Sequence, residues 1–170
     1  ALFRGDLKGA RQLVDEAHQR IPASTELALV AAELARLEGQ GAAAVAGFTH
    51  ATRQLPVDVR AWHGLGSTLA EQENFSPART ALRQALSLVP DHAETLADLG
   101  ALETRANRLV EAEAAIDQTL PQAPDDYVAW TSRGILLLTK GQPEVALDAL
   151  LKAGLLEPRY AKAQIYTAIA

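Results

Sequence analysis

The 170-residue chain contains neither cysteine nor methionine. Without cysteine it cannot form a disulfide, a thiolate metal site or a cysteine nucleophile, and it suits a reducing or an oxidising compartment equally well. Because methionine is absent even at residue 1, we expect the sequence to be an excerpt of a longer protein.

Basic clusters and long apolar runs are also missing. The chain has 21 acidic and 16 basic residues, which gives a net charge of −5. A nucleic-acid backbone requires clustered Lys and Arg, so we expect no nucleic-acid partner. A membrane-spanning helix needs about 20 consecutive apolar residues, whereas the apolar run 134–138 ends at once in Thr-Lys-Gly. With no signal peptide either, we expect no membrane insertion, and the cytoplasm and the periplasm both remain open.

Motifs for catalysis or cofactor binding are absent as well. The sequence "HGLG" at 63–66 lacks the third glycine and the preceding strand of a nucleotide-binding loop. The four histidines have no metal-ligand spacing, and the acidic pair Asp125 and Asp126 is better explained as a helix start after Pro124. We therefore expect a protein that is not an enzyme and that binds no metal and no cofactor.

A repeat of 34 residues runs through nearly the whole chain. Prolines that close apolar segments recur at this spacing, and small and apolar residues recur in the same register. Several columns in one register make chance an inadequate explanation. The columns are Pro22, Pro56, Pro90, Pro124 and Pro158; Ala10, Ala44, Ala78, Ala112 and Ala146; Val14, Phe48, Leu82, Ile116 and Leu150; and Gly66, Gly100 and Gly134.

Each repeat predicts a pair of antiparallel helices, because apolar residues follow helical spacing twice with a breaker between. In the repeat with Trp62, the helices are expected close to 59–72 and 76–89. Gly66 and Ala78 are small because the two helices must approach closely there. Each pair leaves an apolar face that only its neighbour can cover, so the pairs must stack.

Residues that favour helix starts precede these helices. Ser76 is predicted to cap a second helix, with Pro77 at its first position, where a missing N–H costs nothing. Asp91 with Glu94 suits a capping box for the following first helix. Further caps are predicted at Asp58 and at Asp125 or Asp126.

The spacing of Trp62, Leu65 and Gly66, followed by Ala78, Leu82, Ala85 and Pro90, resembles the tetratricopeptide repeat. The resemblance implies an all-α fold, a right-handed superhelical solenoid of antiparallel helix pairs. We expect one such domain over 1–170. It divides into a half repeat at 1–24, full repeats at 25–58, 59–92, 93–126 and 127–160, and the start of another at 161–170.

Two departures from the family pattern fall in the repeat 93–126. Glu103 occupies a site that is commonly apolar, and we expect it to pair with Arg133 on the next first helix. Pro121 is expected to shorten the second helix of that repeat.

The resemblance implies that first helices line a concave groove that holds a peptide or helix of a partner. The groove residues are expected to include Glu33, Arg60, His63, Ser67, Glu94, Asp98, Arg105, Thr131, Ser132 and Ile135, extended by Lys162, Ile165 and Tyr166. The clamp by which co-chaperone members bind an acidic C-terminal tail is missing, because Leu29, Glu33, Gly64, Glu94 and Asp98 stand at its positions.

We therefore expect a non-catalytic protein–protein interaction scaffold of a larger protein, and the Ala- and Arg-rich usage favours a bacterial source. The alternative is an accessory domain of an enzyme, such as a transferase, whose catalytic domain lies outside this sequence. A small secretion-type chaperone ranks third. The apolar ends, Leu29 with Val30 and Ile135 with Ile165, are expected either to anchor a longer ligand or to bind a neighbouring molecule.

Overall fold

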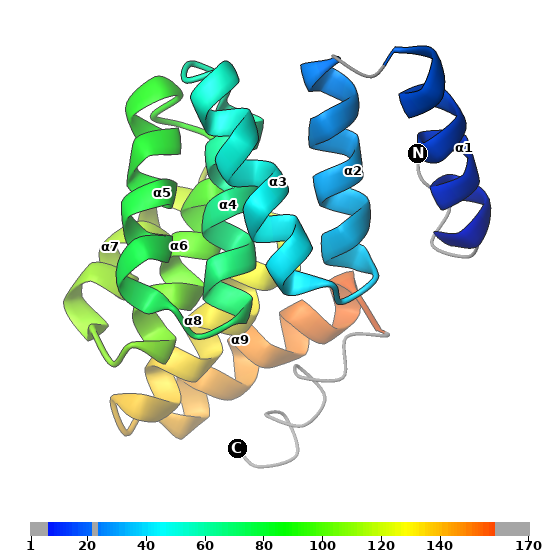
Figure 1. Ribbon diagram of the computed structural model, residues 1–170. Coiled ribbons are helices and arrows are strands. Elements are labelled where there is room, and N and C mark those ends of the chain that lie inside the picture. Colours follow the sequence, from blue (N-terminus) through cyan, green and yellow to red (C-terminus); the bar gives the residue numbers. More distant parts are fainter. Residues whose placement is uncertain (1–6, 22–23, 159–170) are drawn as a thin grey trace. The chain divides into compact units, whose positions relative to one another are not determined.

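The computed structural model describes residues 7–21 and 24–158, and all regular structure in these ranges is helical (Figure 1). The helices are α1 (Leu7–Arg20), α2 (Thr25–Leu37), α3 (Gly41–Gln54), α4 (Val59–Glu71), α5 (Phe75–Leu88), α6 (Ala93–Arg105), α7 (Leu109–Thr119), α8 (Tyr127–Thr139) and α9 (Pro143–Leu156). Pro22 and the expected segment 161–170, with Lys162, Ile165 and Tyr166, lie outside the described residues.

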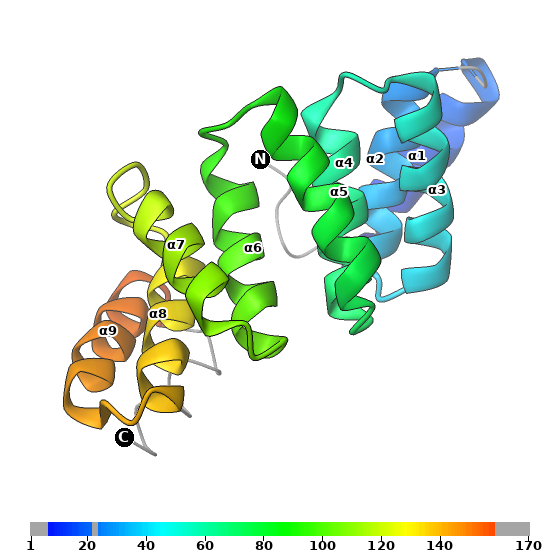
Figure 2. The same cartoon turned by 90° about the vertical axis from the view of Figure 1, so that its left-hand side faces the viewer.

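The helices belong to two compact units, Ala1–Val89 with α1–α5 and Pro90–Ala170 with α6–α9. In the first unit α2 packs on α3 and α4 on α5, while α3 packs on α4 and α1 on α2. In the second unit the pairs are α6 with α7 and α8 with α9, and α7 also packs on α8. Short turns make the two helices of each pair antiparallel (Figures 1 and 2). The predicted helix pairs are thus confirmed, and the first helices begin at Thr25, Val59, Ala93 and Tyr127.

Close approach within each pair depends on a glycine in the first helix. A Cβ placed on Gly66 would lie 2.6 Å from Leu82 Cγ, and one on Gly134 would lie 2.5 Å from the same atom of Leu150. Gly100 stands in the same relation to Ile116, at 2.8 Å from Cγ1. The large side chain sixteen residues later fills the space over each glycine, so the recurring glycine is a packing requirement.

The helix starts differ in part from those predicted. Asp58 and Asp126 do cap α4 and α8, through backbone N–H groups that donate to their carboxylates. The predicted cap Ser76 is wrong, because α5 begins one residue before it, with Asn74 at the cap position. The predicted capping box of Asp91 is also wrong, because His92 caps α6 and its ring nitrogen accepts from Thr95 N at 3.3 Å.

The third repeat confirms one expectation and corrects another. Helix α7 has 11 residues where α3, α5 and α9 each have 14, in keeping with Pro121 just beyond its end. Arg133 does not pair with Glu103; its Nη1 lies 2.9 Å from the carboxylate of Asp117 on α7. Glu103 is only 1% exposed and lies 3.2 Å from Arg108 Nε, just past the end of its own helix. Each charge thus finds a partner nearer than the adjacent first helix.

Two tryptophans form hydrogen bonds between the starts of first helices and the preceding loop. Trp62 Nε1 donates to the carbonyl oxygen of Pro56 at 2.8 Å, and Trp130 Nε1 donates to that of Pro124 at the same distance. Lys152 Nζ lies 4.0 Å from the centre of the Trp130 ring. Among the helices of the described ranges, none is long and apolar enough for a membrane span.

Candidate partner-binding surface

The first helices of each unit lie side by side, α2 with α4 and α6 with α8. They carry the residues that the sequence predicts for the groove. Because positions i, i+3 and i+7 of a helix share a face, Arg60, His63 and Ser67 follow one line along α4. Glu94, Asp98 and Arg105 form a similar line along α6. These lines are the candidate surface in each unit.

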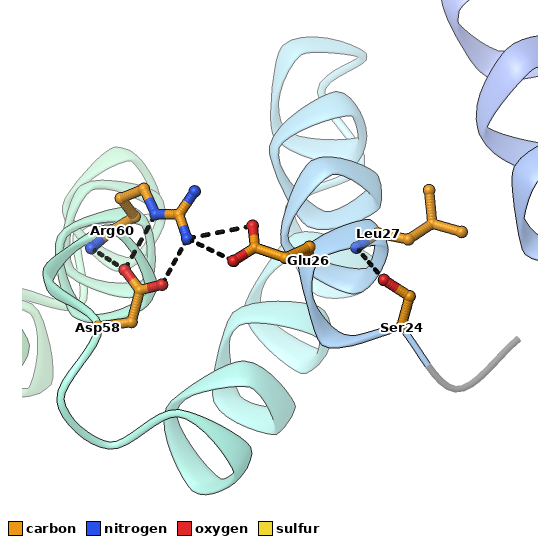
Figure 3. A network of polar contacts seen from close by, with 5 residues as sticks. All are labelled: Ser24, Glu26, Leu27, Asp58 and Arg60. Atoms are coloured by element: carbon orange, nitrogen blue, oxygen red, sulfur yellow. Dashed lines mark hydrogen bonds and ion pairs between the residues drawn. The ribbon is translucent and has the colours of Figure 1, made fainter. Parts of the chain in front are cut away.

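An ion-pair network joins α2 to the start of α4 (Figure 3). Arg60 Nη2 donates to both carboxylate oxygens of Glu26, at 2.9 and 3.1 Å, and to Asp58 at 2.6 Å. Nearby, Ser24 Oγ accepts from Leu27 N at 3.2 Å and so caps α2. Hydrogen bonding to Arg60 lowers the pKa of Asp58 below its ordinary value of 3.8, and the two carboxylates raise the pKa of Arg60. Arg60 therefore links the two first helices at this end through an exposed ion pair.

A second arginine bridges the same two helices near their other ends. Arg36 donates to Glu33 on its own helix, at 2.6 and 3.1 Å, and to Glu71 of α4 at 2.7 Å. The hydrogen bond with Glu33, followed by the charge of that carboxylate, raises the pKa of Arg36 against the effect of its burial. The surface of α2 and α4 is thus bounded by one arginine bridge at each end.

Between these two arginine bridges, some side chains of α2 and α4 are partly exposed to solvent. His63 and Ser67 are half-buried, Val30 is 46% exposed, and Leu29 is buried at 6%. Gly64, which stands at a position of the missing co-chaperone clamp, is a packing residue, because a Cβ there would lie 2.3 Å from Cε1 of Phe48. The side chains that are at least partly exposed here are therefore His63, Ser67 and Val30.

The surface of α6 and α8 is acidic at the start of the two helices. Asp126 caps α8 by accepting from Val128 N and Ala129 N at 2.8 and 3.0 Å. Burial raises its pKa above 3.8, and the nearby charges of Asp98 and Glu94 raise it further. Glu94 is exposed and Asp98 is half-buried. This end of the second unit therefore presents negative charge, while Arg105 is exposed at the far end of α6.

Thr131 and Ser132 are placed differently from the other predicted groove residues. They are 3% and 2% exposed. Their hydroxyl groups donate to backbone carbonyls one turn earlier, on Tyr127 at 2.7 Å and Val128 at 2.8 Å. Ile135 is half-buried. The two hydroxyls thus satisfy α8 itself and leave little surface for a ligand.

Sequence reasoning missed the partners of the two arginines. Glu26 and Arg60 are 34 residues apart, at the same position of consecutive repeats, and Arg36 and Glu71 are 35 apart. Opposite charges at one repeat position are a signal that could have revealed the bridge between Glu26 and Arg60, because that position recurs on neighbouring first helices. Arg36 and Glu71 are offset from the repeat by one residue, so the same signal does not reveal their bridge. No group of three metal-binding side chains occurs in the described part of the chain.

Comparison with known proteins identifies the family to which this fold is similar. A model of the tetratricopeptide repeat matches residues 69–132. The crystal structure of TTC0263, a tetratricopeptide protein of Thermus thermophilus, aligns with a TM-score of 0.80 and 19% identity over 97% of this chain and 90% of that one. The chain belongs to the tetratricopeptide repeat family. It is an all-α helical repeat solenoid. A second tetratricopeptide structure, YrrB, described as having an unusual peptide-binding site, aligns with a TM-score of 0.70 and 21% identity over 96% of this chain and 84% of that one.

Curated relatives of this tetratricopeptide chain are much longer proteins. Human protein O-mannosyl-transferase TMTC3 is 32% identical over 122 residues, which cover 62% of this chain and 13% of the relative. The mouse PEX5-related protein is 30% identical over 105 residues, which cover 61% of this chain and 18% of the relative. The match therefore spans less than a fifth of either relative.

Proposed function

We propose that this tetratricopeptide chain is a protein–protein interaction scaffold that binds a peptide or helical segment of a partner along its first helices. The observation that carries the proposal is the pair of arginine bridges between α2 and α4. They link two neighbouring first helices, and His63, Ser67 and Val30 lie between them, partly exposed. A preorganised surface of this kind loses little conformational entropy when a ligand binds. The peptide-binding site named for YrrB supports the same class of function.

The charges of each unit indicate which ligand groups it suits. Arg60 uses Nε and Nη2 for Asp58 and Glu26, and its Nη1 bonds to no other described residue. A carboxylate of the ligand can therefore bind Nη1 without breaking the bridge. Along α6, Glu94 and Asp98 suit a basic side chain instead, and Arg105 suits another acidic one. Each unit taken by itself thus has its own preference: Arg60 of the first unit suits an acidic group, and α6 of the second unit suits a segment that carries both signs.

The test begins with identification of a partner by affinity capture and mass spectrometry. Its affinity is then measured by calorimetry for Arg60→Ala with Arg105→Ala and for a control pair, Arg53→Ala with Arg83→Ala, on the second helices α3 and α5. Both control arginines are exposed. The pair Arg60→Ala with Arg105→Ala is expected to weaken binding by about 1–3 kcal/mol for each residue that is a hot spot. The control pair is expected to cause no measurable loss of affinity.

Because Arg60→Ala also removes a bridge, urea denaturation of each variant must show that the fold persists. An equal loss of affinity from the control pair, or no loss from either, would place the partner on another surface.

A second candidate is that the chain is the tetratricopeptide region of a larger enzyme. The similarity to TMTC3, whose name describes a transferase, favours it. On this proposal the first helices bind a protein and the chemistry lies in another domain. Reading the full open reading frame tests it, since a catalytic domain beside this region is required.

A further inference from the structure

The outward face of α9 carries exposed leucines where the other second helices do not. Leu151 is 48% exposed and Leu155 is 82% exposed. The 34-residue repeat identifies the matching positions on the other three second helices, which hold threonine, serine, proline or charged residues. These are Thr49 and Arg53 on α3, Arg83 and Ser87 on α5, and Asp117 and Pro121 at α7.

The repeat also shows what these positions face when another helix pair follows. Helix α4 packs on α3, yet Arg53 stays exposed. Helix α8 packs on α7, yet Asp117 and Pro121 stay exposed. A further first helix stacked on α9 in the same way would therefore leave Leu155 in water. It would reach Leu151 only at the edge, as Arg133 of α8 reaches Asp117 while the side chain of Asp117 stays 58% exposed. The two leucines are not an internal stacking surface, and an exposed apolar pair of this size calls for another explanation.

Charged side chains accompany the leucines on the same face. At 100° per residue, Val145, Asp148, Lys152 and Leu155 lie on one side of the helix, with Leu151 at its edge. Val145 is 56% exposed. Lys152 Nζ lies over Trp130 rather than over the carboxylate one turn earlier. Asp148 is exposed and forms no ion pair within the described residues. This face thus has an apolar component and an acid that lacks a partner.

The order of these residues is symmetric about position 150. Val145 and Leu155 lie five residues to either side, and Asp148 and Lys152 lie two residues to either side. We infer that α9 binds the α9 of a second copy of this chain in antiparallel orientation. Lys152 of each copy is then level with Asp148 of the other, Leu155 is level with Val145, and the two Leu151 side chains are adjacent. A two-fold contact requires such self-complementarity.

One helix against one helix is a small interface. Stable complexes bury about 1,200–2,000 Å² in total, and a single pair of four-turn helices falls short of that. The dimer is therefore weak, with a dissociation constant on the order of 10–100 µM. It uses the outward face of a second helix, so it leaves the first-helix surface of the proposed function open.

Sedimentation equilibrium of the 170-residue chain from roughly 10 µM to 1 mM tests the dimer, since this span brackets the expected dissociation constant. The weight-average mass is expected to rise from that of a monomer towards twice that value. Leu151→Ser with Leu155→Ser should leave a monomer at every concentration. A matched control, Val57→Ser with Val110→Ser, removes two valines that are 78% and 77% exposed elsewhere and should dimerise as before.

A charge exchange tests the antiparallel arrangement itself. Asp148→Lys places a lysine level with Lys152 of the other copy and should weaken the dimer at least tenfold. Asp148→Lys combined with Lys152→Asp restores opposite charges and should recover the affinity. Circular dichroism confirms that each variant is folded. A wild-type chain that stays monomeric at about 1 mM, a dimer that survives the leucine changes, or a double variant as weak as the single one overturns the inference.

Discussion

Three glycines show how a single atom decides the spacing of a helix pair. Over Gly66, Gly100 and Gly134 the side chain sixteen residues later occupies the volume of a Cβ. The first repeat has Ala32 at this position and compensates with Gly47 opposite, where a Cβ would lie 2.8 Å from that of Ala32. One of the two facing positions must therefore be a glycine, and either helix of the pair can carry it.

The same substitution is therefore expected to have opposite effects at two glycines. Gly66→Ala inserts a methyl group into Leu82 and should lower the free energy of unfolding by about 1–2 kcal/mol, since overpacking outweighs the gain in helix propensity. Gly154→Ala, within α9 and with nothing within 4 Å of the new Cβ, should raise it by up to about 1 kcal/mol. Urea denaturation of both variants measures the difference. Two changes of the same sign would mean that packing at Gly66 adjusts without cost.

The sequence predicts these glycines because their column repeats, but it predicts individual caps and ion pairs poorly. Ser76 and Asp91 are good capping residues by type, and each lies within two residues of the true cap. A shift of one residue in a turn exchanges one hydrogen-bonding side chain for another at little energetic cost. Arg133 had both Glu103 and Asp117 as acids within reach of its long side chain. Local choices of this kind depend on backbone geometry that residue types do not encode.

At the scale of elements, α4 and α8 begin in the same way but with different electrostatics. Each is capped by an aspartate, Asp58 or Asp126. Residue 60 of α4 is an arginine that donates to Asp58, and the matching residue of α8 is Val128. The pKa is accordingly lowered for Asp58 and raised for Asp126. The hydrogen bond from Arg60 thus lowers the pKa of Asp58, whereas burial, with the charges of Asp98 and Glu94, raises the pKa of Asp126.

These opposite shifts predict opposite pH dependence. A lowered pKa stabilises the fold above pH 3.8, and that contribution is lost as the pH falls through the folded value. A raised pKa costs stability at neutral pH, and the cost is relieved as the pH falls from the folded value to 3.8. Asp58→Asn should therefore lose about 1 kcal/mol at pH 7 and nothing at pH 2. Asp126→Asn should be more stable than wild type at pH 7, because it lacks the buried charge, and should show no difference at pH 2.

Denaturation of the wild type and both variants between pH 2 and pH 7 measures these differences. Asparagine keeps a capping oxygen in either helix, so loss of the cap does not confuse the comparison. The two variants following the same pH course would contradict the assigned causes.

At the scale of the whole molecule, repeat architecture makes stability a sum of local contributions. In such an architecture each helix pair packs only on the pairs next to it, and no pair encloses a hydrophobic core by itself. Phe48 shows the consequence in the first unit, because its ring is 3% exposed and lies against Gly64 of α4. In the second unit a core cluster is built around Ile116, Leu120 and Leu136.

Phe48→Ala is expected to act locally. It should remove about 3–5 kcal/mol of packing from α2, α3 and α4. Hydrogen–deuterium exchange with mass spectrometry should show faster exchange in peptides of these helices, and nearly unchanged exchange in peptides of α8 and α9. Uniform acceleration across the chain would instead indicate one cooperative unit.

The fold was predictable at this scale because the 34-residue spacing repeats in many columns, so errors at single positions do not matter. The candidate surface was less predictable. Its helices follow from the repeat, but the repeat does not tell that Thr131 and Ser132 are buried or that Arg60 is already paired. Those facts depend on how closely α6 approaches α8 and α2 approaches α4, which residue types alone do not give.

The anchoring of the indole rings has a further use. Trp62 and Trp130 are the only two tryptophans of the chain, and each donates to a proline carbonyl at the start of a first helix, one in each unit. The protein therefore carries one tryptophan per unit at an equivalent place. Replacing either by phenylalanine leaves a chain whose tryptophan emission, excited at wavelengths that the three tyrosines do not absorb, reports on a single unit, with no dye attached. Unfolding of the two halves can then be followed optically, one at a time.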